Sequence, residues 1–344
     1  MLFRSDIGFG YTKFKSSDEE GMIASICNPL ASLAELQMSP GDIIDSLAVE
    51  HNGEIVLVGQ LAAKYNRMAA RSTYRERAQD ENFEALYKAA IVAAYYQYPQ
   101  LELTLVTGLP NDDLQDQQND IQKKINEITS VSYYYDRTKY TIEIKYADVI
   151  VKTQPDGFWT EMHYDDNLEK VTMQNDHGEA IKRMGILDCG HGTLNMSLFE
   201  GNDILGIGTK TCSADGVHAI YDSVGMALKA NFKYDPSHLD IESAIVKEEV
   251  RIRGVVQNVS SIIRPIKEQY AASSFQAIYE KWKNELDQLN AIFIPGGGSN
   301  VIAEKLATLL AEKTRYTETY TLEDAQLLNV RGYYKIGQLT ENNI

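Results

Sequence analysis

The segment Asp6-Ile7-Gly8-Phe9-Gly10 shares its pattern, Asp-x-Gly-x-Gly, with Asp188-Cys189-Gly190-His191-Gly192, 182 positions further along the chain. Each copy follows a short apolar stretch and precedes a second strand-like stretch, so each predicts a β-hairpin with glycines in its turn. The distance between the copies indicates equivalent hairpins in two halves of the chain. We therefore expect the two halves to repeat one architecture.

The chemistry of such a hairpin suits a phosphate-bearing ligand. A glycine-rich turn exposes backbone N–H groups in a concave arrangement that fits phosphate oxygens, and the leading carboxylate, Asp6 or Asp188, can hold Mg²⁺ directly or through water. One copy alone is a weak signal, because Asp and Gly are common in turns. The pair favours two hairpins that face each other and grip a nucleotide polyphosphate. The alternative is an inherited structural repeat without a ligand.

A third glycine-rich segment, Ile292-Phe293-Ile294-Pro295-Gly296-Gly297-Gly298-Ser299-Asn300, joins a predicted strand to a predicted helix. Glycines at such a junction let a flat or anionic ligand approach the backbone closely. The alternative is an ordinary tight turn, although such turns seldom need three consecutive glycines. We therefore expect this segment to take part in ligand binding together with the two hairpins.

Two polar side chains are candidates for a role beside the hairpins. Lys13 is on the strand that leaves the first hairpin and can reach back to the β- and γ-phosphates, although a lone lysine there can also be a solvated surface residue. Gln154 precedes Pro155 at the end of a predicted strand. A neutral amide can orient an attacking water, as in other nucleotide hydrolases; the alternative is an ordinary loop residue.

A stripe of basic residues stands out in this acidic chain. It consists of Lys64, Arg67, Arg71 and Arg75 at helical spacing, followed by Arg77. We expect a solvated face; the sharper alternative is a contact with an acidic face of a neighbouring subunit. The imidazole of His191 is expected to be incidental or a minor phosphate contact, because backbone N–H groups bind the phosphates in this scheme.

The composition constrains the partners and the compartment. The chain has 344 residues and a formal net charge of −16. This length suggests two domains, and the acidity disfavours direct binding to nucleic acid, which needs clustered Lys and Arg. The three cysteines have no metal-ligand spacing and suit a reducing cytoplasm. The most apolar run, residues 89–96, is shorter than the roughly 20 residues of a membrane span, and Asp6 leaves no room for a signal peptide. We expect a cytoplasmic protein that does not attach to membranes.

The pattern of apolar residues predicts an α/β chain. In the first half, residues 1–3, 11–14 and 22–27 predict an antiparallel meander, and residues 28–53 are mixed and polar. Further strands are predicted at 55–58, 101–106, 133–135, 140–146 and 148–153, and helices at 81–98 and 113–128. In the second half, strands are predicted at 185–187, 193–199, 204–207 and 291–294. Helices are predicted from about 213–215, with Ser213 or Asp215 as N-cap, within 255–282, and from 299 to 310.

These motifs resemble the actin, hexokinase and heat-shock-chaperone ATPase superfamily. Within it, the chain is most similar to bacterial actins, particularly the ParM-like filaments of plasmid segregation. The segments that carry the resemblance are residues 6–13, 187–196, 294–299 and 324–334, the last of which looks like the returning helix of the family. They span nearly the whole chain in the family's order.

The resemblance implies an actin-like fold, in which two similar α/β domains, each with a smaller subdomain, surround a central nucleotide cleft. Domain I would comprise residues 1–160, with a small subdomain at about 28–78, and would be completed by residues 322–344. Domain II would comprise residues 161–321, with a small subdomain at about 218–288. The subdomain at 28–78 is assigned by its order in the chain, because no motif matches there.

The resemblance also implies a role for each site residue. Asp6 and Asp188 would arrange hydrated Mg²⁺, and Gln154 would orient the hydrolytic water. The phosphate-binding residues would be Gly8, Phe9, Gly10, Lys13, Gly190, His191, Gly192 and Thr193. The adenosine-binding residues would be Asp215, Gly296, Gly297, Gly298 and Asn300. His191 departs from the small or acidic residues that the family usually has at that turn.

The function that the resemblance implies is a filament-forming ATPase that uses Mg²⁺ and ATP, with GTP as an alternative. Its partners would be further copies of this chain and a basic DNA-binding adaptor protein at a centromere-like site, so that polymerisation segregates plasmid DNA and hydrolysis triggers disassembly. The alternative is a non-polymerising small-molecule kinase of the same superfamily. Such kinases need a carboxylate base; Gln154 cannot accept a proton, but Asp156 keeps this alternative open. A chaperone-type ATPase is disfavoured, because nothing like a peptide-binding domain follows Ile344.

Overall fold

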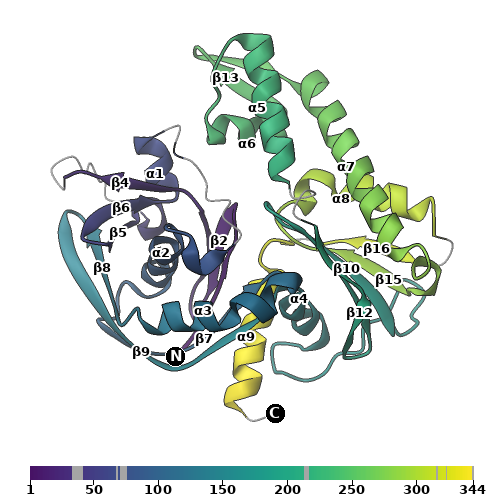
Figure 1. Cartoon of the computed structure of the whole chain (residues 1–344), viewed down its shortest axis with the longest axis horizontal. Coiled ribbons are helices and arrows are strands. Elements are labelled where there is room, and N and C mark those ends of the chain that lie inside the picture. Colours follow the sequence, from purple (N-terminus) through teal and green to yellow (C-terminus); the bar gives the residue numbers. More distant parts are fainter. Residues whose placement is uncertain are drawn as a thin grey trace. The chain divides into compact units, whose positions relative to one another are not determined.

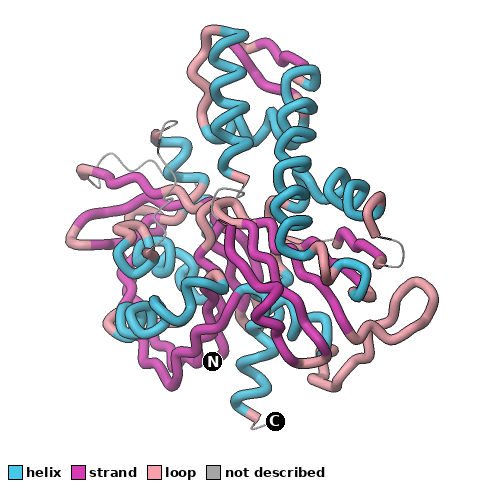
Figure 2. Tube along the Cα trace, turned by 45° about the vertical axis from the view of Figure 1, so that its right-hand side comes forward, coloured by secondary structure: helices cyan, strands magenta, loops and turns pink. Residues whose placement is uncertain are grey.

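The computed structural model describes residues 1–32, 42–66, 69, 76–212, 217–314, 317–322 and 324–342 (Figure 1). The chain forms two compact units. Unit 1 comprises Met1–Lys170 and Asn329–Ile344, and unit 2 comprises Val171–Leu328. Strands and helices are interspersed in both (Figure 2), which confirms the predicted α/β class.

Unit 1 is built on a mixed sheet whose described residues form strands in the order β3-β2-β1-β7-β9-β8-β5-β6-β4. The strands are β1 (Leu2–Ile7), β2 (Tyr11–Lys15), β3 (Glu20–Ala24), β4 (Cys27–Leu30), β5 (Ala48–His51), β6 (Glu54–Val58), β7 (Gln100–Leu109), β8 (Ser130–Tyr135) and β9 (Thr138–Thr153). β1, β2 and β3 form the predicted antiparallel meander, whereas β1 pairs parallel with β7 and β7 parallel with β9. The carboxyl ends of β1, β7 and β9 therefore lie at one edge of the sheet.

The helices of unit 1 form its core and connections. They are α1 (Gln60–Tyr65), α2 (Phe83–Tyr95), α3 (Leu114–Asn126), α4 (Gln154–His163) and α9 (Leu328–Glu341), with short 3-10 turns η2 (Ile43–Ser46), η3 (Arg77–Gln79) and η4 (Asn111–Asp113). Helix α2 packs against β1, β2 and β5, and the large sheet curls around it (Figure 1). For this reason α2 is buried on nearly all sides. Its sequence pattern predicts burial along one face only.

Unit 2 is built on a smaller sheet, in which the described strands have the order β12-β11-β10-β15-β16. The strands are β10 (Arg183–Cys189), β11 (Leu194–Glu200), β12 (Asp203–Cys212), β15 (Ala291–Ile294) and β16 (Glu318–Thr321). The helices are α5 (His218–Phe232), α6 (His238–Lys247), α7 (Ser260–Trp282) and α8 (Ser299–Ala311), with the turn η5 (Leu286–Gln288). A separate hairpin, β13 (Glu249–Ile252) and β14 (Val255–Asn258), lies between α6 and α7 in the chain.

The two sheets share one local topology around the pentads. In unit 1 the order is β3-β2-β1-β7, and in unit 2 it is β12-β11-β10-β15. In both, the strand before the pentad pairs antiparallel with the strand after it and parallel with a later strand on its other side. The predicted repeat of one architecture is therefore confirmed at the level of strand order and direction.

Several predicted elements differ from the observed ones. Residues 28–53, which are mixed and polar and carry no predicted strand, contribute most of β4 and all of β5. Pro29 is tolerated because β4 is an edge strand. The two strands predicted at 140–146 and 148–153 are one strand, β9, with a register shift against β7 between Leu103 and Thr104. The N-cap of α5 is Val217, so the prediction of Ser213 or Asp215 as cap is wrong; both residues lie outside the described part of the chain.

The C-terminal helix α9 packs on α4 with little space between the two backbones. A Cβ atom at Gly332 would lie 1.6 Å from the carbonyl oxygen of Gly157. The next residue, Tyr333, donates a hydrogen bond from its hydroxyl to the Thr153 carbonyl at 3.1 Å. The carbonyl of Tyr333 accepts a hydrogen bond from Nε of the buried Arg4 at 2.8 Å. Close backbone contact and polar anchors thus fix α9 beside the start of α4, where Gln154 lies.

We predict that Gly332→Ala destabilises the protein by about 2–3 kcal/mol, because the added methyl group forces α9 away from α4. Urea denaturation followed by circular dichroism measures this change. The control is Gly206→Ala, because a Cβ atom there has no neighbour within 4 Å and should change stability by less than about 0.5 kcal/mol. Equal unfolding midpoints for the two variants would contradict the close packing of α9.

Candidate functional site

The first pentad forms a tight hairpin between β1 and β2. The Gly8 N–H donates to the carbonyl oxygens of Asp6 at 3.0 Å and Tyr11 at 3.1 Å. A Cβ atom at Gly8 would lie 2.7 Å from the Tyr11 oxygen, so the turn requires glycine. Ser25, which the sequence analysis missed, holds the turn from behind: its hydroxyl donates to the Gly8 carbonyl at 2.7 Å and its N–H to the Gly10 carbonyl at 2.9 Å.

Asp6 is fully buried, and two other predicted site residues hold its carboxylate. Lys13 is opposite Asp6 in the β1–β2 register, and its Nζ donates to Oδ2 at 2.9 Å. Gln154 Nε2 donates to Oδ1 at 3.1 Å. The interpretation of Lys13 as a solvated surface residue is therefore wrong, since it is 9% exposed. Three residues chosen from separate parts of the sequence thus form one cluster in unit 1.

Gln154 is the first residue of α4 and not a loop residue. The preceding Thr153 caps the helix, and its side chain accepts a hydrogen bond from the Asp156 N–H while the Asp156 carboxylate accepts one from the Thr153 N–H. This capping box fixes the start of α4 at the end of β9. The amide of Gln154 points its nitrogen at Asp6 and therefore turns Oε1 away from that carboxylate. Asp156, the candidate kinase base, uses its carboxylate to cap the helix.

The second pentad repeats the hydrogen bonding of the first. The Gly190 N–H donates to the carbonyl oxygens of Asp188 at 3.2 Å and Thr193 at 2.8 Å. Asp188 is buried, but the residue opposite it in the register is Asn195, where the first hairpin has lysine. The Asn195 side-chain oxygen accepts a hydrogen bond from the Thr211 hydroxyl at 2.9 Å. The two hairpins therefore have the same backbone hydrogen bonds and the same leading carboxylate. Of these two hairpins, the first has a lysine opposite its aspartate and the second has an asparagine.

The three-glycine segment packs directly against the second hairpin. The Gly298 N–H donates to the Cys189 carbonyl at 2.7 Å, and the Cys189 N–H donates to the Pro295 carbonyl at 3.0 Å. Gly296 has φ +95, and a Cβ atom there would lie 2.3 Å from Oδ1 of Asp188. A Cβ atom at Gly298 would lie 2.8 Å from the Cys189 oxygen. The three-glycine segment and the second hairpin are thus in close backbone contact, and side chains at Gly296 and Gly298 would clash with the hairpin.

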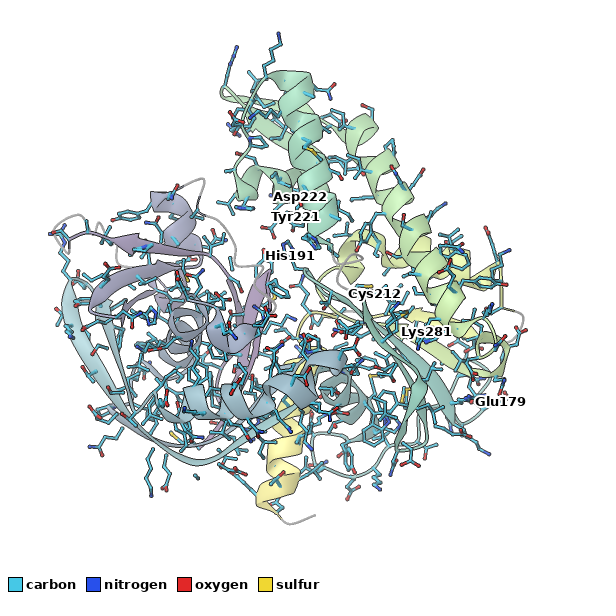
Figure 3. The ribbon with its side chains drawn as sticks, in the orientation of Figure 1. Glu179, His191, Cys212, Tyr221, Asp222 and Lys281 are labelled. Atoms are coloured by element: carbon cyan, nitrogen blue, oxygen red, sulfur yellow. The ribbon has the colours of Figure 1, made fainter. Side chains whose placement is uncertain are left out.

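His191 connects the second hairpin to α5. Its carbonyl accepts a hydrogen bond from the His218 N–H at 2.7 Å, at the first residue of the helix. Its ring packs edge-on against Tyr221, with centroids 4.8 Å apart (Figure 3). From the sequence, this imidazole is expected to be incidental or a minor phosphate contact, and its packing against Tyr221 was not predicted. Asp215 lies outside the described residues, and the side chain of Asn300 is likewise not described.

The basic stripe is not a single solvated face. Lys64 is exposed, and Arg67, Arg71 and Arg75 lie outside the described residues. Arg77 is 6% exposed. The prediction that it lies on a solvated face and the alternative that it contacts a neighbouring subunit are therefore both wrong for this residue. The sequence spacing suggests exposure, but η3 turns the Arg77 side chain inward, over the ring of Phe9.

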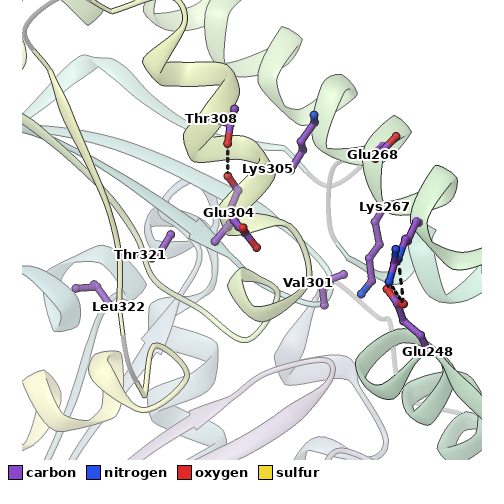
Figure 4. A pocket seen from close by; sticks show the side chains of 11 residues that line it. Glu248, Lys267, Glu268, Val301, Glu304, Lys305, Thr308, Thr321 and Leu322 are labelled. Carbon is purple, nitrogen blue, oxygen red and sulfur yellow. Dashed lines mark hydrogen bonds and ion pairs between the residues drawn. The ribbon is translucent and has the colours of Figure 1, made fainter. Parts of the chain in front are cut away.

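Unit 2 contains a cavity of about 530 Å³ between α7, α8 and β16 (Figure 4). Val301, which directly follows Asn300, forms part of its wall, so the cavity begins at the end of the glycine segment. Its charged lining residues are Glu248, Glu268, Glu304, Arg264, Lys267 and Lys305. Glu248 and Arg264 form an ion pair at 2.9 Å. The lining is thus polar and balanced in formal charge.

None of the helices in the described part of the chain is long and apolar enough to cross a membrane. Within the same residues, no three or more His, Cys, Asp and Glu side chains are grouped as ligands for a metal ion.

Known protein families match both units. Residues 5–157 match the family described as the N-terminal domain of actin-like proteins. Residues 186–308 match the family described as archaeal actin homologue MreB-like, C-terminal. Among curated proteins, no sequence matched this chain.

Solved structures resemble the chain over nearly its whole length. The subunit of a 15-stranded ParM filament from Clostridium botulinum is 17% identical, with a TM-score of 0.79 and 98% of each chain covered. A non-polymerisable quadruple mutant of pCBH ParM is 15% identical, with the same TM-score and coverage. The archaeal actin homologue Ta0583 in complex with ADP is 15% identical, with a TM-score of 0.75 and coverage of 98% of this chain and 99% of that one. With actin-like families matching both units and actin homologues sharing its fold, this chain belongs to the actin-like superfamily.

Proposed function

We propose that this protein is a nucleotide-dependent, filament-forming ATPase of the ParM-like type. The observation that carries the proposal is the repeated hairpin, in which a buried aspartate leads a glycine turn at the same place in two sheets of equal local topology. In this proposal units 1 and 2 are the actin-like domains I and II, and both hairpins contact one nucleotide. The ADP complex of Ta0583 supports a nucleotide as the ligand.

The residues present fit Mg²⁺ and a polyphosphate. Asp6 and Asp188 would hold the hydrated ion, which neutralises charge on the phosphates. The backbone around Gly8, Phe9 and Gly10 and around Gly190, His191, Gly192 and Thr193 would donate to phosphate oxygens. These turns fit that role because a Cβ atom at Gly8 would clash with the hairpin itself, so only glycine leaves the backbone in this shape. Lys13 would be shared between Asp6 and the β- and γ-phosphates.

Gln154 would orient the water that attacks the terminal phosphate. Asp6 accepts a hydrogen bond from Nε2 of Gln154, so Oε1 is directed away from the carboxylate and can accept a proton of that water. The capping box fixes the backbone of Gln154, which limits the positions that its amide can reach. The side chain thus positions water without changing its own charge.

The adenosine would bind at the three-glycine segment. Gly296, Gly297 and Gly298, with Asp215 and Asn300, would enclose the ribose and the base. The cavity lined by Val301, which follows this segment in the chain, would take part of the base. ATP is the proposed nucleotide, with GTP as the alternative.

Self-assembly is the proposed use of the nucleotide cycle. The ParM filament from Clostridium botulinum, with its TM-score of 0.79, supports polymerisation as a property of this fold. The net charge of −16 supports an indirect link to DNA through a basic adaptor protein at a centromere-like site. We therefore propose plasmid segregation in the cytoplasm as the process, with growth driven by nucleotide binding and disassembly triggered by hydrolysis.

The alternative of a small-molecule kinase is weaker. It depends on Asp156 as the base, and the carboxylate of Asp156 accepts a hydrogen bond from the Thr153 N–H at 3.1 Å. A base in that position would give up the helix cap when it takes a proton.

Light scattering after addition of Mg-ATP, followed by sedimentation, separates the two functions. We expect rising scatter, protein in the pellet, and hydrolysis that increases more steeply than protein concentration, because assembly precedes hydrolysis. Hydrolysis proportional to protein concentration, accelerated by a metabolite and without pelleted protein, would support the kinase instead.

Gln154→Ala should slow hydrolysis by about 100-fold, as expected when a group that positions the nucleophile is lost, while assembly with Mg-ATP remains. Phosphate release and pelleting measured on one sample give both quantities, and filaments should accumulate. Gln118→Ala, in the polar helix α3, is the matched control. Hydrolysis at the normal rate in the Gln154 variant would rule out its role in orienting water.

Gly296→Ala should weaken binding of Mg-ATP at least tenfold, because the added Cβ atom displaces the Asp188 carboxylate. Gly201→Ala is the control, since Gly201 also has positive φ but has no atom near the added Cβ; it reports backbone strain alone. Calorimetric titration measures both affinities. Equal affinities would show that Asp188 and the three-glycine segment do not form the binding site.

A further inference from the structure

The buried side chain of Arg77 in unit 1 stacks on Phe9, a residue of the first hairpin. The guanidinium carbon lies 3.6 Å from the centroid of the Phe9 ring, and Phe9 is the fourth residue of the pentad. Both side chains are buried, with Arg77 6% and Phe9 8% exposed. The Arg77 N–H donates to Oε1 of Gln117 on α3 at 2.9 Å. A chain of contacts therefore connects α3 and η3 to the turn of the hairpin.

Among the described residues, the carboxylates near this buried cation form no ion pair with it shorter than 3.7 Å. Its closest ion pair joins Nη1 to Oδ2 of Asp80 at 3.7 Å, and Nη1 donates no hydrogen bond within the described part of the chain. Burial lowers the pKa of Arg77 to about 10, while Asp80, Asp6 and Asp113 oppose this shift. A buried charge costs free energy unless it is compensated, so an apolar side chain would fill this space at lower cost. Packing alone does not require an arginine here.

Phe9 is fixed at two points. The hydroxyl of Ser25 holds the Gly8 carbonyl, which belongs to the same peptide group as the Phe9 N–H. Because a trans peptide directs its N–H opposite to its carbonyl, this contact points the Phe9 N–H away from Ser25. Arg77 holds the ring at the other end of the residue. With both ends fixed, the N–H keeps one direction.

We propose that Arg77 is a positioning residue for phosphate binding. By stacking on Phe9, it holds the backbone N–H groups of the first hairpin in the orientation in which they donate hydrogen bonds to a phosphate. The inference rests on the proposed function and assigns to Arg77 a role in recognition of the phosphate chain, not of the nucleoside. A planar cation on the ring face provides this hold, and a lysine ammonium provides it poorly because it does not stack.

A double-mutant cycle tests the proposal with Phe9→Leu, Arg77→Lys and the double variant. The probes are Mg²⁺ with a nonhydrolysable ATP analogue, and adenosine alone, both titrated by calorimetry. Arg77→Lys keeps a positive charge near Asp80, and Phe9→Leu leaves Arg77 intact, so at least one variant tests the contact even if the other fails to fold. Arg251→Lys, which changes an exposed arginine in unit 2, is the control.

We expect each single substitution to weaken binding of the ATP analogue about tenfold. The double variant should bind no more weakly than the weaker single variant. Adenosine affinity should be unchanged, and the Arg251 control should bind like wild type. Three results would overturn the proposal and leave the proposed function intact. They are losses of affinity for the analogue that multiply in the double variant, wild-type affinity in both single variants, and an equal loss of affinity for adenosine. A wild-type protein that binds no nucleotide would overturn the proposed function, and this inference with it.

Discussion

The buried carboxylate of Asp6 is the constraint on which the site in unit 1 depends. A carboxylate removed from water needs partners for its charge, and here Lys13 and Gln154 each hold one oxygen. The sheet brings these partners together. Lys13 is the cross-strand neighbour of Asp6, and Gln154 follows β9, whose carboxyl end shares an edge of the sheet with that of β1. Pairing of parallel strands therefore assembles a site from residues 148 positions apart.

Unit 2 uses the same hairpin with different neighbours. Asp188 faces Asn195 instead of a lysine, and the glycine segment after β15 packs against it. The parallel pairing of β10 and β15 causes this meeting, just as the pairing of β7 with β1 and β9 causes the one in unit 1. In the proposed function this difference divides the work: unit 1 supplies the cation and the amide for hydrolysis, and unit 2 supplies the surface for the nucleoside.

Local patterns predicted the parts of this fold that local physics determines. Both hairpins, α3 and α8 follow from glycine turns and apolar spacing, and the structure contains them where the pattern predicts. The edge strand β4 and the inner strand β5 were missed, because both are short and β4 contains Pro29. The contacts of Ser25 and Arg77 were also missed, since a sequence does not show which way a side chain turns in a 3-10 turn or after a strand. The contact of Gly296 with Asp188 depends on long-range strand pairing, which no local pattern contains.

The central claim is that one nucleotide is held by both aspartate-led hairpins. A crystal structure of the protein with Mg²⁺ and a nonhydrolysable ATP analogue tests it most directly. The account predicts phosphate oxygens within hydrogen-bond distance of backbone N–H groups in both turns, with water ligands of the ion contacting Asp6 and Asp188. An analogue bound by one hairpin alone, or bound elsewhere, would contradict it.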